Sequence, residues 1–118
     1  MKVIVAGSRT INDYEIVRNA IDETRQRGLN ITAIIDGTAH GVDELASRYA
    51  VEHGIYNIRV PADWKYYGKG AGRIRNVQMA EIGDVLIAIW NGTSKGTKHM
   101  IECAKTRNLE IVKIITGS

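Results

Sequence analysis

Four turns rich in glycine and hydroxyl side chains recur along the sequence, and each follows a short apolar run. They span Gly7 to Arg9, Gly37 to Asp43, Gly68 to Gly72 and Asn91 to Thr97. Glycine lets a backbone approach a ligand closely, and each turn leads into a helical pattern whose free N–H groups and dipole favour phosphate. Turn glycines are also ordinary in loops between strands and helices. Four such loops together favour a phosphate-binding site.

Positive charge is concentrated in one segment. The net charge of the chain is +3, and the segment between Pro61 and Asn76 carries that excess. Such a local cluster favours an anionic ligand at one place over a general coat for nucleic acid. Arg9 and Arg75 can each form bidentate contacts with phosphate, and Lys95 can reach the same anion. The alternative for these side chains is solvated surface charge.

Three aromatic residues, Trp64, Tyr66 and Tyr67, follow the third apolar run. They can stack on a nucleobase or pack a long loop against the protein, and the sequence leaves both readings open. Trp90, at the end of the fourth run, is interpreted as core or pocket wall.

Apolar runs and helical patterns alternate along the whole chain. The predicted strands are Val3–Ala6, Ala33–Asp36, Asn57–Val60, Val85–Trp90 and Ile111–Ile115, all expected to be buried on both faces. The predicted helices are 12–27, opened by Asn12 with Glu15 as a capping pair, 42–54, 72–82 and 97–107.

Strict alternation predicts the fold class, an α/β, three-layer, Rossmann-like domain over residues 1–118. About five parallel strands carry helices on both faces. In such sheets, ligands bind beyond the carboxyl ends of the strands, which is the edge where all the glycine-rich turns gather. The sequence therefore predicts its ligand site at that edge.

The amino-acid composition limits the class of protein to which this chain can belong. Of the 118 residues, 44% are hydrophobic and 25% are charged, which is ordinary for a globular protein. No run is long enough to span a membrane, and we expect no leader and a cytoplasmic location. The single cysteine, Cys103, excludes an internal disulfide. It is interpreted as a packing residue with no histidine partner nearby in sequence.

The motifs resemble a known family in order along almost the whole chain. Six segments resemble the YspA-like, cpYpsA-related branch of the SLOG superfamily: Val3 to Arg9, the 37–43 loop, Pro61 to Trp64, Gly68 to Gly72, Arg75-Asn76 and Gly92 to Thr97. That superfamily also includes the LOG phosphoribohydrolases and the DprA (Smf) proteins. The resemblance implies a Rossmann-like fold and a nucleotide-type ligand.

The LOG enzymes cleave an N-glycosidic bond, and their motifs are only partly present. Arg75-Asn76-Val77-Gln78-Met79 resembles their arginine helix, and Asn91 to Thr97 resembles their phosphate loop. The position of their catalytic glutamate falls on Met100, which cannot handle a proton. Asp63 and Asp36 are therefore the candidate catalytic residues, while Asp43 is interpreted as a cap or loop anchor and Asp84 as structural.

The predicted ligand-binding residues come from the turns and the basic segment. They are Gly7, Ser8, Arg9, Gly37, Thr38, Ala39, Gly41, Asp43, Trp64, Arg75, Asn76, Gly92, Thr93, Ser94, Lys95, Gly96 and Thr97. His40 is a further candidate contact, whereas His53 and His99 are assigned to helix surfaces. The histidines and cysteine show no metal-ligand spacing, so no metal and no cofactor are expected.

Three functions are compatible with these residues. The first is a module that senses or sequesters a nucleotide or nucleotide-derived small molecule. The second is a LOG-like N-glycosidic hydrolase that uses another carboxylate. The third is DprA-like binding of single-stranded nucleic acid, which the modest net charge disfavours. By analogy with the family we also expect a homodimer and no membrane partner.

Overall fold

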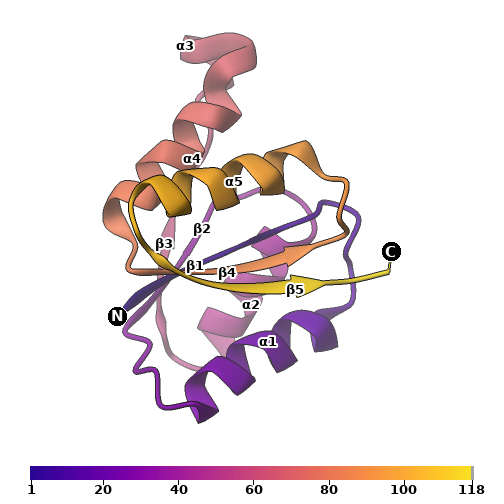
Figure 1. The fold of residues 1–118 in the computed structure, drawn as a ribbon, viewed down its shortest axis with the longest axis vertical. Coiled ribbons are helices and arrows are strands. Elements are labelled where there is room, and N and C mark those ends of the chain that lie inside the picture. Colours follow the sequence, from indigo (N-terminus) through magenta and orange to yellow (C-terminus); the bar gives the residue numbers. More distant parts are fainter. Residues whose placement is uncertain (118) are drawn as a thin grey trace.

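The computed structural model describes residues 1–117 and shows a sheet of five parallel strands (Figure 1). The strands lie in the order β3-β2-β1-β4-β5. They are β1 (Lys2–Gly7), β2 (Ala33–Asp36), β3 (Tyr56–Arg59), β4 (Val85–Trp90) and β5 (Glu110–Ile115). The helices are α1 (Tyr14–Gln26), α2 (Val42–Glu52), α3 (Trp64–Tyr67), α4 (Ala71–Ile82) and α5 (Lys95–Thr106), with a 3-10 turn, η1 (Gly68–Gly70), before α4.

Helices cover both faces of the sheet, which confirms the three-layer Rossmann-like fold. Figure 1 shows α1 and α2 on one side and α4 and α5 on the other. Because side chains alternate along a strand, Val3 and Val5 of β1 pack in the core under α1 and α2. Ile4 and Ala6 pack in the core under α4 and α5. The sheet therefore has two separate apolar cores.

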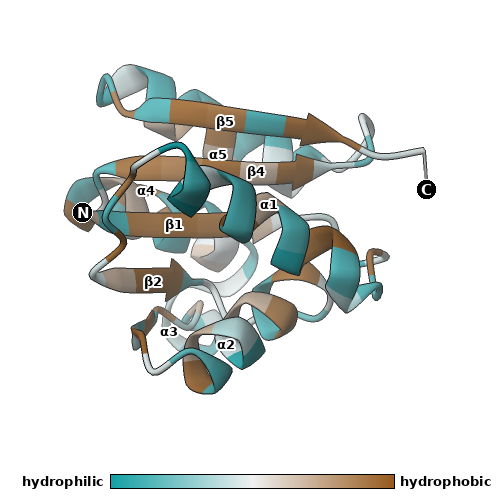
Figure 2. Cartoon of the chain, turned by 90° about the horizontal axis from the view of Figure 1, so that it is seen from below, coloured by the Kyte–Doolittle hydropathy of each residue, from teal (hydrophilic) through white to brown (hydrophobic). Residues whose placement is uncertain are grey.

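Burial on both faces holds for the three central strands only. Every residue of β2 is buried, whereas β3 and β5 lie at the two edges of the sheet and are partly exposed. Tyr56 in β3 is 72% exposed and Ile115 in β5 is 58% exposed. Figure 2 shows the same contrast, with hydrophilic segments interrupting β5. The prediction was wrong for the edge strands, because strand order is not encoded in apolar runs.

Several predicted boundaries also differ. The cap of α1 is Asp13, whose carboxylate accepts from the N–H of Glu15, and not Asn12. Strand β3 begins one residue earlier than predicted, because Tyr56 pairs with Ala33. The predicted loop after β3 contains the short helix α3, whose first turn is capped by Asp63. Local hydrogen bonds made by aspartate decided two of these boundaries.

Within residues 1–117, none of the helices has both the length and the apolar content needed to cross a bilayer.

Candidate functional site

The strand order reverses direction between β1 and β4, and a hollow opens beyond their carboxyl ends. The chain leaves β1 toward α1 on one face and leaves β4 toward α5 on the other face. Such a switch point is where ligands bind in open α/β sheets. The hollow, called here the switch hollow, measures about 370 Å³. It is lined by Gly7, Ser8, Arg9, Thr10, Ala39, Asn91, Ser94, Gly96 and Thr97.

Ser8 joins the loops after β1 and β4. Its backbone N–H donates to the carbonyl of Ile89 at 3.1 Å, and its Oγ accepts from the N–H of Asn91 at 3.1 Å. The Asn91 side chain in turn accepts from the N–H groups of Thr93 and Ser94, each at 2.9 Å. Ser8 is buried, so its hydroxyl is a structural part of the hollow.

The N-terminus of α5 forms one wall of the switch hollow. Ser94 caps the helix, accepting at Oγ from the N–H of Thr97 at 3.4 Å and from its hydroxyl at 3.1 Å. Helices leave their first N–H groups without partners inside the helix, and Gly96 in this turn lines the hollow. This wall therefore favours an anion. Of the predicted residues here, Gly92, Thr93 and Lys95 are exposed and do not line the hollow.

A second hollow of about 180 Å³ adjoins the first and shares Arg9 and Ala39 with it. We call it the arginine hollow. It is lined by Arg9, Gly37, Thr38, Ala39, Ala62, Trp64 and Arg75. Two guanidinium groups from different parts of the chain therefore meet at the carboxyl edge of the sheet.

Arg75 is held in place by two hydrogen bonds. Its Nη1 donates to the carbonyl of Gly37 at 2.5 Å, and its Nε donates to Asn76 Oδ1 at 3.2 Å. Burial lowers the pKa of Arg75 and the nearby charge of Arg9 acts in the same direction, whereas Asp43 opposes this shift. The pKa of Arg75 therefore stays below its ordinary value despite the nearby carboxylates of Asp43 and Asp36.

The glycines of the 37–41 loop serve contacts within the protein. Gly41 has φ +80°, and a Cβ there would lie 2.6 Å from the carbonyl oxygen of Ser8. A Cβ on Gly37 would lie 2.7 Å from Arg75 Nη1. At these two positions, the sequence predicted a close approach to a ligand, but the close approach is made within the protein. Gly41 lies against the backbone of Ser8, and Gly37 lies against the side chain of Arg75.

Asp43 lies beneath the same loop and anchors it, as predicted. The side chain is buried, and Oδ2 accepts from the N–H of Ala39 at 3.1 Å. Desolvation by burial raises the pKa of Asp43 to about 6. This carboxylate is therefore destabilised by its surroundings at neutral pH.

Asp36 was predicted at the ligand edge, but the structure places it completely buried below the loop. It accepts from the N–H of Thr38 at 2.8 Å, from Asn57 Nδ2 at 2.9 Å and from Arg59 Nε at 3.2 Å. These bonds hold Thr38 at φ +65° and join β2 to β3. The surroundings of Asp36 give it a structural role in shaping the loop.

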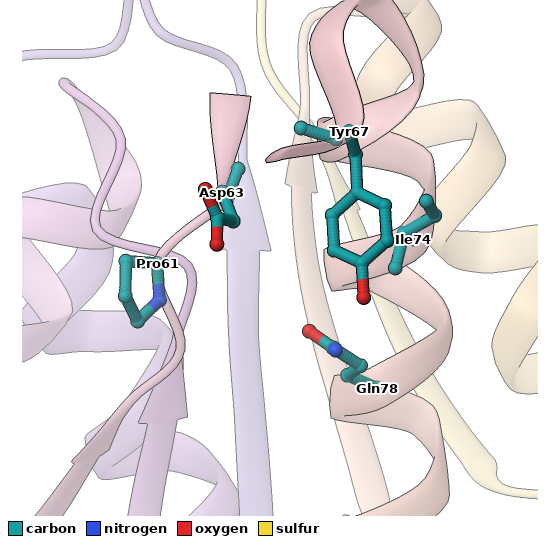
Figure 3. Close-up of a pocket in the computed structure, with 7 residues that line it drawn as sticks. Pro61, Asp63, Tyr67, Ile74 and Gln78 are labelled. Atoms are coloured by element: carbon teal, nitrogen blue, oxygen red, sulfur yellow. The ribbon is translucent and has the colours of Figure 1, made fainter. Parts of the chain in front are cut away.

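Asp63 lines a third hollow, of about 500 Å³, shown in Figure 3. We call it the Tyr67 pocket, and it is lined by Pro61, Ala62, Asp63, Tyr67, Ala71, Ile74 and Gln78. Ala62 also lines the arginine hollow, so the two hollows are neighbours. Asp63 is the one candidate catalytic residue that lines any of the three hollows described here.

The aromatic residues after β3 are exposed over much of their surface, while Trp64 lines the arginine hollow and Tyr67 lines the Tyr67 pocket. Trp64 is 53% exposed and Tyr66 is 79% exposed. Tyr66 and Tyr67 contact each other edge to face, with ring centroids 4.8 Å apart. Trp90 instead packs against the core under α5 and donates from Nε1 to the carbonyl of Ser94 at 3.0 Å, which confirms the core position that was one of its two predicted roles.

The contact between His99 and Cys103 was not predicted, although Cys103 packs against the core under α4 and α5 as predicted. They lie one helical turn apart on α5, with Sγ 3.5 Å from Nε2, and Asn76 Nδ2 lies 3.0 Å from His99 Nδ1. Burial lowers the pKa of His99 and raises that of Cys103. The spacing of four residues in a predicted helix was the sequence signal for this contact.

Asn76 is buried and its side chain donates to the carbonyl of Gly96 at 3.3 Å. This bond links α4 to the first turn of α5.

The predicted site residues also lack three that line the switch and arginine hollows, Thr10, Ala62 and Asn91. His40 lines none of the three hollows described above. Across residues 1–117, no three His, Cys, Asp or Glu side chains gather into a group that could hold a metal ion.

Comparison with known proteins identifies the family. The model of the YspA, cpYpsA-related SLOG family matches residues 1–67. The gene 61 protein of Mycobacterium phage D29 is 31% identical over an alignment of 117 positions that covers 94% of each chain. The chain belongs to the YspA, cpYpsA-related SLOG family. The matched segment contains the β1 turn and the 37–43 loop, and therefore five of the nine residues that line the switch hollow.

Two solved structures share the fold of this SLOG chain. DNA processing protein A (DprA) from Streptococcus pneumoniae has a TM-score of 0.79 and 21% identity over 98% of this chain and 50% of its own. DprA from Helicobacter pylori has a TM-score of 0.72 and 20% identity over 96% of this chain and 64% of its own. The SLOG chain thus spans about half of one protein and under two thirds of the other.

Proposed function

We propose that this chain binds a nucleotide or a nucleotide-derived phosphate compound in the switch and arginine hollows, as a sensing or sequestering module. The observation that carries the proposal is the meeting of Arg9 and Arg75 beside the N-terminus of α5, at the switch in strand order. Guanidinium groups hold phosphate in a bidentate manner, and helix N-termini add backbone donors. Trp64 adds an exposed aromatic surface at the rim.

The surroundings of the carboxylates favour binding over hydrolysis. Met100, at the position of the LOG glutamate, is buried in the core under α5. Asp36 is buried and hydrogen-bonded on several sides. A catalytic role for Asp63 stays a prediction, because it lines the Tyr67 pocket and not the arginine hollow.

The test combines thermal shift with chromatography of the ligand. The panel contains nucleoside mono-, di- and cyclic phosphates, ADP-ribose and NAD. A ligand present far above its dissociation constant stabilises a fold by a few kcal/mol, so we expect a raised Tm with the ligand recovered intact. Arg9→Ala should abolish the shift, and Arg73→Ala, an exposed arginine on α4, should retain it. Release of free base would support the hydrolase, and the absence of any shift would refute the ligand class.

A second candidate is single-stranded nucleic acid. The Helicobacter pylori DprA, which shares the fold, binds single-stranded DNA. Helix α3 and η1 carry exposed Trp64, Tyr66 and Tyr67 with Lys65 and Lys69, and α3 projects beyond the sheet in Figure 1. Stacked bases and neutralised phosphates are the usual means of binding single strands.

Salt dependence separates the two candidates. Binding of an oligonucleotide across several phosphates weakens steeply with salt, whereas a mononucleotide covers few charges. We therefore expect oligothymidine to bind no more tightly than a mononucleotide at 200 mM salt. Tight oligonucleotide binding that is lost in Tyr66→Ala would favour the second candidate instead.

We further propose that residues 1–118 form one domain of a cytoplasmic homodimer, by analogy with the family. Exposed apolar side chains on α4, Val77 and Ile82, are available for such a contact. Light scattering at working concentration tests this state, and a mass of one chain would refute it.

A further inference from the structure

The Tyr67 pocket has the size and the wall chemistry of a small-molecule site. Its volume of about 500 Å³ lies within the range of ligand pockets. The connection after β3 supplies Pro61 and Asp63, and α3 and α4 supply the opposite wall. Figure 3 shows Pro61 and Asp63 across the opening from Tyr67, Ile74 and Gln78.

The walls combine flat apolar surface with two polar groups. Pro61, Ile74 and the ring of Tyr67 offer surface on which an aromatic ring can pack. The amide of Gln78 offers one donor group and one acceptor. Asp63 Oδ1 accepts from the N–H of Tyr66 at 3.0 Å, which leaves its carboxylate further acceptor capacity. A planar heterocycle with an amino group matches this arrangement.

The Tyr67 pocket also adjoins the hollow that contains the two arginines. Ala62 lines both this pocket and the arginine hollow, and Arg9 continues that hollow into the switch hollow. The three hollows therefore follow one another along the carboxyl edge of the sheet. A molecule with an anionic group at the arginines can extend its other end toward Tyr67.

We propose that the Tyr67 pocket binds the base of the nucleotide, and that this base carries an exocyclic amine. This inference rests on the proposed function, because it takes the phosphate to lie at Arg9 and Arg75. Asp63 accepts from the amine, as carboxylates accept from base amines elsewhere. Gln78 forms paired bonds with the neighbouring ring edge, and Tyr67 packs on the ring.

The test compares ligands that differ in one group. AMP carries an amine where IMP carries a carbonyl oxygen, and ribose 5-phosphate carries no base. By calorimetry, AMP should bind about tenfold more tightly than IMP, or more, as expected for base-edge hydrogen bonds. Asp63→Asn should remove most of that preference, because an amide can also donate to the carbonyl. Asparagine is an equally good helix cap, so the fold of α3 is retained.

Matched variants separate the pocket from general effects. Gln78→Leu should weaken AMP binding several-fold and leave ribose 5-phosphate unchanged. Glu102→Gln, which removes an exposed carboxylate from α5, should change neither. Equal affinity for AMP, IMP and ribose 5-phosphate, unchanged in Asp63→Asn, would overturn the base pocket while leaving phosphate binding intact.

Nucleosides carry no phosphate, so they test the Tyr67 pocket without relying on Arg9 and Arg75. Adenosine and inosine, titrated at millimolar concentration by NMR, should shift resonances of Tyr67 and Gln78, with adenosine preferred. That preference supports the base pocket even if every phosphate compound fails to bind, which would refute the proposed function alone. Equal shifts for both nucleosides, or none, would overturn the base pocket.

Discussion

Arg75 on α4 donates from Nη1 to the carbonyl oxygen of Gly37 at 2.5 Å, across 38 positions of sequence. The bond ties a helix on one face of the sheet to the loop that follows β2. One guanidinium thus shapes the loop and supplies charge to the arginine hollow. Substitution of this residue should therefore change both folding and ligand binding.

Arg75→Lys should separate charge from geometry. Lysine keeps the positive charge but loses the planar fork, so the bonds to Gly37 and Asn76 cannot both be kept. We expect the free energy of unfolding to fall by about 1–3 kcal/mol, measured by denaturant titration, together with weaker nucleotide binding. The matched change Arg73→Lys, on the exposed side of the same helix, should stay within about 0.5 kcal/mol. Equal losses in both variants would contradict the role assigned to Arg75.

Gly41→Ala and Gly92→Ala form a second matched pair. Both glycines have positive φ, +80° and +86°, but only at Gly41 would a Cβ collide with backbone, 2.6 Å from the oxygen of Ser8. The strain of an alanine at positive φ costs about 1–2 kcal/mol in either place. Overpacking should add about 1–3 kcal/mol in Gly41→Ala alone. Thermal unfolding measures both, and equal Tm values would show that the loops do not interlock as described.

Asp43 should make stability depend on pH. Its pKa in the folded state is raised to about 6 from an ordinary 3.8, so the folded protein holds the proton more tightly than the unfolded chain. The contribution of this group therefore falls as pH rises from about 4 to about 6, by about 2–3 kcal/mol. In Asp43→Asn this decline should vanish. The measurement is the difference in unfolding free energy between the two proteins across that range, and a constant difference would contradict the prediction.

Asp36→Asn should lower the stability of the fold and should not directly affect a catalytic step. The amide would lose charge-assisted bonds to Arg59 and would present a donor toward Asn57. We expect a loss of about 2–4 kcal/mol. Asp63→Asn should cost little, since asparagine also caps helices. Any turnover lost in Asp36→Asn should thus follow the folded fraction, measured by circular dichroism. Full stability with turnover abolished would restore Asp36 as a catalytic residue.

The sequence by itself determined the order of the strands and of the four longer helices, and the edge of the sheet at which the turns gather. Runs such as Val85–Trp90 are strongly apolar, and alternation of strands and helices permits few topologies. The resemblance of the motifs also identified the family. These features depend on local patterns and on general rules of chain connection, which are readable without coordinates.

Only the tertiary structure decided which polar groups face the hollows. Asp36 ends one strand in the sequence and Asp63 follows another, yet Asp36 is buried and bonded to Arg59 whereas Asp63 lines the Tyr67 pocket. Edge placement likewise exposed Tyr56 in β3 and Ile115 in β5. Burial and hydrogen bonding depend on partners distant in sequence, such as Asn57 and Asp36, which approach each other only when β2 and β3 pair.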